Sequence, residues 1–197
     1  TELTKKIESN YKDNKTISFL NFKEKKNPGD YRNEGASHAQ TKYILFLDSD
    51  IRINEKTIKF VNNKIENDFG QKKIYWGLYS SYSEDIFSKI QQQILRYRFS
   101  NIFFDKAKNK GKPYCGQSSH FLISRETFNE IGGFNPYLRI REDNDFCIRA
   151  NFLEIDSELC EEFEADHLKK YSLYSEYFQK PFHATMVKVL EPKIFSI

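Results

Sequence analysis

Hydrophobic and polar positions follow two periods along the chain, and together they predict strands that alternate with helices. Apolar runs or period-two alternation predict strands over residues 16–22, 43–47, 74–78 and 121–123, and again up to residue 165. Helical spacing predicts helices over residues 2–12, 30–41, 55–68 and 84–107, then a short one that is capped by Ser124 and ends at Gly132-Gly133, and another opening at Arg141. This alternation is typical of an α/β sheet rather than a helical bundle.

The apolar run Tyr-Ile-Leu-Phe-Leu at residues 43–47 stops directly on Asp48-Ser49-Asp50. Consecutive apolar residues predict a strand buried on both faces, as found in the middle of a parallel sheet. Ligand sites in such sheets lie beyond the carboxyl ends of the strands, where two carboxylates can hold a divalent cation and, through it, a diphosphate. The alternative is that Asp48 and Asp50 are turn residues before a helix capped by Asn54. This segment alone favours neither interpretation.

Length, composition and charge limit which classes of protein the chain can belong to. A chain of 197 residues forms one domain, or one domain with an appendage, and its 18 Phe and 12 Tyr supply large buried surfaces. The net charge of +3 is too small to indicate nucleic-acid binding. The 3 cysteines lack metal or redox spacing, which indicates a reducing compartment. No apolar stretch is long enough to span a membrane.

Three groups of polar residues are candidates for catalysis or metal binding: Asp48 with Asp50, Glu142 with Asp143, and His167. Carboxylates and an imidazole suit a metal-assisted group transfer in which a second acid acts as base. Each group also has an ordinary structural explanation. Acids at a helix N-terminus are stabilised by the helix dipole, and a lone histidine is more often a surface or core residue. Spacing alone leaves both explanations open.

The order of the motifs resembles that of the family 2 glycosyltransferases. The resemblance covers about residues 1–170 and rests on the segments Arg-Asn-Glu-Gly-Ala at 32–36, Tyr-Ile-Leu-Phe-Leu-Asp-Ser-Asp at 43–50, Ile-Gly-Gly-Phe-Asn at 131–135, Arg-Glu-Asp-Asn-Asp-Phe at 141–146 and Ala-Asp-His at 165–167. It implies a GT-A fold, a Rossmann-related mixed sheet flanked by helices, over residues 1–167. It also implies inverting transfer of a sugar, of the hexosyl type, from a nucleotide-diphosphate sugar to a hydroxyl group.

The resemblance assigns roles on the donor side of the reaction. Asp50 would bind Mn²⁺ or Mg²⁺ at the donor diphosphate, and Asp48 would contact the nucleotide ribose or share the metal. His167 would complete the metal site, and Arg32 would lie near the nucleotide. A UDP-sugar is the favoured donor.

On the acceptor side, the resemblance implies that Asp143 is the catalytic base and that Glu142 supports it. Gly116, Gln117 and Ser118 would line the pocket for the sugar and the acceptor, which is a glycan or a lipid-linked glycan. Heavy use of Lys, Asn, Ile and Phe suggests a bacterial source and a polysaccharide product.

The N-terminus departs from the family pattern. The first strand, helix and second strand that normally form the pocket for the base have no counterpart here, so we expect an N-terminally truncated domain. This chain by itself would then be weakly active or inactive. The alternative function is a non-catalytic GT-A-like binding or scaffolding module.

Residues 168–197 form an aromatic and basic appendage. We expect a helix packed on the domain, with a peripheral membrane contact as the alternative. We expect the protein to lie in the cytoplasm or at the inner face of the membrane.

Two other function classes are disfavoured by the sequence. A metal-dependent phosphotransferase or nuclease would need more cationic residues around Asp50 than Arg52 and Lys56. A nucleic-acid binder is disfavoured because the chain lacks an aromatic RNA-binding motif.

Overall fold

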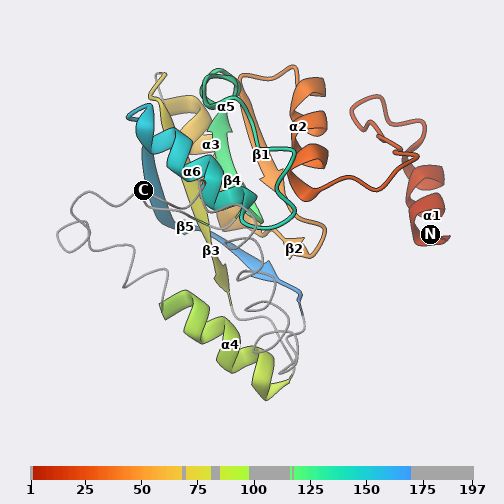
Figure 1. Cartoon of the computed structure of the whole chain (residues 1–197). Helices are drawn as coiled ribbons and strands as arrows, with labels where there is room; N and C mark the ends of the chain where they lie inside the picture. Colours follow the sequence, from red (N-terminus) through yellow and green to blue (C-terminus); the bar gives the residue numbers. More distant parts are fainter. Residues whose placement is uncertain (1, 68–69, 81–84, 98–115, 117, 170–197) are drawn as a thin grey trace.

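The computed structural model describes residues 2–67, 70–80, 85–97, 116 and 118–169 (Figure 1). The helices and strands in chain order are α1 (Glu2–Tyr11), α2 (Pro28–His38), β1 (Tyr43–Leu47), β2 (Ile51–Arg52), α3 (Glu55–Asn67), β3 (Lys73–Ser80), α4 (Ile86–Tyr97), β4 (His120–Ser124), α5 (Arg125–Ile131), α6 (Glu142–Phe152) and β5 (Asp156–His167). The predicted α/β class is confirmed. Among these helices, none is both long and apolar enough to cross a membrane.

The strands form one mixed sheet in the order β1-β4-β3-β5-β2. Within it β3 and β5 run parallel, whereas β4 runs antiparallel to both β1 and β3. The expectation that residues 43–47 form a central strand of a parallel sheet is therefore wrong for the described residues, because β1 lies at an edge and pairs antiparallel with β4. Tyr43, Ile44 and Phe46 are nevertheless buried. An apolar run reports burial on both faces and carries no information on strand direction.

The strand predicted over residues 16–22 is also wrong, because the structure places no strand there. Ile17, Phe19 and Leu20 are each more than a third exposed. Period-two alternation favours a strand only when a neighbouring strand supplies the hydrogen-bond ladder, and no described strand does so here. Of the helix predicted over residues 84–107, α4 accounts for residues 86–97, and residues 84 and 98–107 lie outside the described part.

Two apolar clusters fill the two faces of the sheet. On one face, α5 and α6 pack a large aromatic cluster against β1, β3 and β4, which contains Phe46, Trp76, Phe121, Phe128, Phe134 and Phe146. On the other face, Phe60 and Val61 of α3 pack against a smaller cluster that contains Phe163 and Cys160. Cys147 and Cys160 are free buried thiols, as the sequence predicts, and burial raises the pKa of Cys160 to about 12.

Helix α5 begins and ends where the sequence predicts. The Ser124 hydroxyl accepts a hydrogen bond from the Thr127 backbone N–H at 3.0 Å, and Gly132 ends the helix at φ 85°. Gly133 follows at φ 68°. The Asn33 side chain then accepts from the Phe134 N–H and donates to the Phe134 carbonyl, both at 2.8 Å. These bonds fix α2 to the segment that leads into α6.

Candidate active site

One pocket of about 550 Å³ brings together most of the candidate residues. Its lining contains Arg32, Asp48, Asp50, Ser118, Glu142, Asp143 and His167. These residues come from α2, the loop between β1 and β2, the segment before β4, the start of α6 and the end of β5. Side chains separated by more than one hundred residues in sequence therefore share one pocket.

The loop between β1 and β2 is both a turn and a wall of this pocket. The Asp48 N–H donates to the Ser119 carbonyl at 2.7 Å, and the Asp48 carbonyl accepts from the Ile51 N–H at 3.1 Å. The Asp50 carbonyl accepts from the Leu168 N–H at 2.8 Å. Asn54 caps α3 through the Thr57 N–H at 3.1 Å. The turn interpretation is correct for the backbone, and both carboxylates still line the pocket.

Arg32 bridges two acids in this pocket. Its Nη2 lies 2.7 Å from Asp48 Oδ1, and its Nη1 lies 2.9 Å from Glu142 Oε1. The Arg32 side chain is 14% exposed and that of Glu142 is 11% exposed, so this pair is shielded from water. Burial works against the charged guanidinium, but Asp48 and Glu142 outweigh it and raise the pKa of Arg32 above its usual value.

Asp143 lies in the first turn of α6, directly after the Arg32 partner Glu142. Its Oδ1 accepts a hydrogen bond from the Asn144 N–H at 2.8 Å. Burial, helped by the neighbouring Glu142 carboxylate, raises the pKa of Asp143 from 3.8 to about 6, while the Asn144 N–H and Arg32 oppose the shift. A carboxyl group with this pKa is suited to accept a proton near neutral pH.

On the other side of the pocket, Asp50 and His167 approach each other. His167 Nε2 lies 3.3 Å from Asp50 Oδ2. The His167 side chain is 9% exposed, whereas that of Asp50 is 43% exposed. Burial lowers the pKa of His167 even though Asp50 favours the protonated ring, so the neutral imidazole is favoured at pH 7. The ring also stacks on Tyr79, with centroids 4.5 Å apart.

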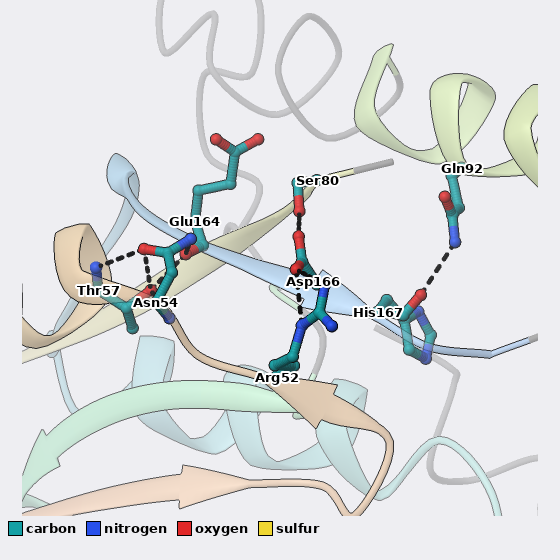
Figure 2. Close-up of polar contacts among 8 residues, drawn as sticks. All are labelled: Arg52, Asn54, Thr57, Ser80, Gln92, Glu164, Asp166 and His167. Atoms are coloured by element: carbon teal, nitrogen blue, oxygen red, sulfur yellow. Dashed lines mark hydrogen bonds and ion pairs between the residues drawn. The ribbon is translucent and has the colours of Figure 1, made fainter. Parts of the chain in front are cut away.

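The end of β5, which carries His167, is held by side chains from neighbouring elements (Figure 2). The Gln92 amide of α4 donates to the His167 carbonyl at 3.0 Å. Arg52 of β2 pairs with Asp166 at 2.7 Å, and Ser80 of β3 donates to the same carboxylate. Burial raises the pKa of Asp166, but Ser80 and Arg52 outweigh it and lower the pKa below its usual value. These bonds fix the strand backbone on both sides of the imidazole.

The side chains of the pocket supply part of a coordination shell for a divalent cation. In the residues that the structure describes, no group of three or more His, Cys, Asp or Glu side chains is arranged to hold a metal ion. Asp50 and His167 are close enough to serve as two ligands, and a carboxylate with an imidazole suits Mn²⁺. The carboxylate of Asp48 instead faces Arg32. Oxygen atoms of a diphosphate and water would have to complete the coordination.

Of the three residues predicted to line the sugar and acceptor pocket, two are described, and their surroundings differ. Ser118 lines the pocket. Gly116 lies against the Trp76 ring, where a side chain would collide with the indole. Gln117 lies outside the described residues.

Sequence reasoning missed further residues of the pocket, namely Tyr79, Ser119, Arg139, Arg141 and Lys169. For two of them, their position in the sequence could have indicated a place in the site. Tyr79 falls near the end of a predicted strand, and Arg141 directly precedes the acidic pair of α6. Arg141 adopts φ 63°, a conformation rare for residues other than glycine and enriched at functional sites.

Comparison with known proteins agrees with this arrangement. The sequence model of the family described as Glycosyltransferase like family 2 matches residues 1–185. No curated protein matches the chain. Because the family match spans nearly all of the chain, and the fold is the expected mixed sheet flanked by helices, the chain belongs to glycosyltransferase-like family 2, a family that implies glycosyl transfer from a nucleotide sugar.

Proposed function

We propose that the protein transfers a hexosyl group from a nucleotide-diphosphate sugar, with a UDP-sugar as the favoured donor, to a hydroxyl of a glycan or lipid-linked glycan. Transfer is metal-assisted and inverts the anomeric configuration. One observation carries the proposal: Asp143, with its pKa raised to about 6, shares a pocket with the Asp50–His167 pair. A proton acceptor and a candidate cation site in one pocket are the two requirements of this reaction.

Asp143 is the proposed base. Its carboxylate takes the proton of the acceptor hydroxyl while the acceptor oxygen forms a bond to the anomeric carbon. The bond between that carbon and the diphosphate breaks at the same time, and the electron pair leaves with the nucleoside diphosphate. Attack from the face opposite the leaving group inverts the configuration. Glu142 keeps a negative charge next to Asp143, which strengthens it as a base, and Arg32 holds Glu142 in place.

Asp50 and His167 are the proposed ligands of Mn²⁺ or Mg²⁺. When bound, the cation would neutralise charge on the departing diphosphate. The chain's contribution is to hold Asp50 and His167 close together, because Asp50 directly precedes β2 and Ile51 of β2 lies opposite His167 of β5. Asp48 and Arg32 lie next to this pair and are proposed to contact the nucleotide, where Arg32 offers donors that suit phosphate oxygens.

We place the transferase domain at residues 1–167, with residues 168–197 as an appendage. Reaction in the cytoplasm, at the inner face of a bacterial membrane, suits a polysaccharide precursor built on a lipid carrier. The appendage beyond Lys169 lies outside the described residues, so its contact with a membrane rests on its aromatic and basic sequence.

The test is release of nucleoside diphosphate from a panel of nucleotide-sugars, with Mn²⁺ and pooled glycan and lipid-linked acceptors. We expect turnover with one donor and its loss in Asp143→Asn. The matched control is Asp145→Asn on the same helix, since Asp145 pairs with Arg149 at 2.7 Å instead of lining the pocket. Equal turnover in Asp143→Asn would overturn the proposal. Donor binding without turnover by the wild-type protein would favour the binding-module alternative.

A further inference from the structure

Helix α4 exposes a row of apolar residues along one side. Ile86 is 75% exposed, Ile90 51%, Ile94 38% and Tyr97 65%. These positions are spaced i, i+4, i+8 and i+11, so they lie on one side of the helix. A surface helix normally turns such a stripe toward the core.

The side of α4 that faces the protein carries buried polar residues. Ser88 is fully buried, and Gln91 and Gln92 are buried as well. The Ser88 N–H donates to the Asp85 carboxylate at 2.7 Å, and Gln92 donates to the His167 carbonyl at 3.0 Å (Figure 2). The Ser88 bond is a local cap at the start of the helix, whereas the Gln92 bond joins α4 to β5 and specifies one orientation of the helix, because turning the helix over would break it. The outward direction of the isoleucines is therefore fixed by the inward side.

Charge on and after α4 is positive. The helix contains Lys89 and Arg96 and no acidic residue, and Lys89 is exposed. The sequence that follows, residues 98–112, contains one Arg and four Lys against a single Asp. Figure 1 shows α4 below the sheet, on the side away from α2 and α5. An apolar stripe on a helix whose charged residues are all basic is the pattern of a helix that lies on an anionic lipid surface.

We propose that α4 is an interfacial helix: Ile86, Ile90, Ile94 and Tyr97 enter the apolar boundary of an anionic bilayer, and Lys89 contacts its headgroups. Because Gln92 binds the backbone of His167, the membrane-facing helix is attached to the strand that ends in the candidate active site. The protein would then present its pocket at a fixed height above the lipid surface. This inference goes beyond the proposed transfer reaction, and its test requires neither donor nor acceptor.

The experiment is sedimentation of the full chain with vesicles of phosphatidylcholine containing phosphatidylglycerol, and with vesicles of phosphatidylcholine alone, at low salt. We expect binding to the anionic vesicles that weakens as salt rises. Replacing the three isoleucines together (I86S/I90S/I94S) should weaken binding by about tenfold or more, because the apolar area that enters the lipid is lost. Replacing them by leucine (I86L/I90L/I94L) should restore it.

The matched control is I58S/I65S/F152S, which removes three apolar side chains of 49%, 44% and 62% exposure from α3 and α6. It should bind vesicles as the wild-type protein does, and circular dichroism should show all variants folded. The proposal is overturned if the wild-type protein binds no vesicles, or if I86S/I90S/I94S binds as well as wild type. It is also overturned if light scattering shows a dimer that the same variant dissociates, since a second copy would then cover the stripe.

Discussion

The two sides of the pocket are organised differently. On the arginine side, formed by Arg32, Asp48, Glu142 and Asp143, opposite charges already neutralise one another at 2.7 and 2.9 Å. On the histidine side, formed by Asp50 and His167, the two groups are 3.3 Å apart and the Asp50 side chain is 43% exposed. The first side is held by ion pairs between side chains. The second is held by strand pairing and by bonds to its backbone.

This difference indicates a division of labour. An ion-paired network keeps a base and its neighbour in one geometry, which suits a proton transfer that depends on precise placement. A solvent-open carboxylate beside a neutral imidazole suits a group that enters and leaves with each donor molecule. Our account therefore assigns acceptor activation to Glu142 and Asp143 on the arginine side, and binding of the metal and the donor diphosphate to the histidine side, with Arg32 and Asp48 contacting the nucleotide between them.

The largest effect is expected from removing the base on the arginine side. Asp143→Asn should lower kcat by about 10³-fold, within the range for general-base catalysis, and leave donor binding unchanged. In the wild-type protein, kcat/KM should rise with pH through an inflection near 6, because Asp143 must lose its proton to act. A pH profile of both proteins checks this. An inflection that persists in Asp143→Asn would assign the titration to another group.

The next largest effect concerns stability. Arg32→Ala should lower the free energy of unfolding by about 3 kcal/mol, because it leaves the buried Glu142 carboxylate without its partner. Urea denaturation measures this. The control is Arg52→Ala, whose ion pair with Asp166 involves a half-exposed side chain and should contribute less than about 1 kcal/mol. If both variants lost the same free energy of unfolding, burial would not determine how much an ion pair contributes to stability, and the prediction would be wrong.

On the histidine side, His167→Ala should weaken Mn²⁺ binding by about 10–100-fold, because it removes a proposed ligand of the metal. Titration calorimetry with the metal and UDP measures this. His38→Ala is the control, because His38 is exposed on α2 and bonds to its neighbours Glu34 and Ser37. Unchanged affinity in His167→Ala would remove the histidine from the metal site.

The smallest effect follows from proton linkage at Asp143. Its pKa in the folded protein, about 6, lies above its usual value of 3.8, so the folded state holds the proton more tightly. Stability from this group is present below about pH 4 and is lost as pH rises through 6. Asp143→Asn should therefore be more stable than the wild type at pH 8, with the difference vanishing near pH 4. Denaturation at both pH values checks the sign.

Local patterns predicted the local structure well. Ser124 and Gly132 mark the two ends of α5, and the run at 43–47 is a strand, because caps and apolar periodicity depend on neighbouring residues. Strand direction and edge position depend on distant partners, which explains the error on β1. The alternation at residues 16–22 failed for the same reason.

The site was predictable only as far as motifs and resemblance reached. They pointed to Asp50, Asp143 and His167, which line the pocket, but the bridge from Arg32 to Glu142 spans 110 positions and leaves no local signal. The histidines illustrate the limit. His120 lies fully buried with Nε2 at 3.2 Å from the Phe163 carbonyl, and burial lowers its pKa to about 4, whereas His167 lines the pocket. Only tertiary packing separates these two residues.

The division of labour is tested most directly by calorimetric titration of UDP, with and without Mn²⁺, into the wild-type protein, Asp50→Asn and Asp143→Asn. Our account predicts that Mn²⁺ strengthens UDP binding to the wild-type protein and to Asp143→Asn equally. In Asp50→Asn the strengthening should fall by about tenfold or more, because a metal ligand is lost. Binding that is unaffected in Asp50→Asn but lost in Asp143→Asn would contradict the assignment of donor binding to the histidine side.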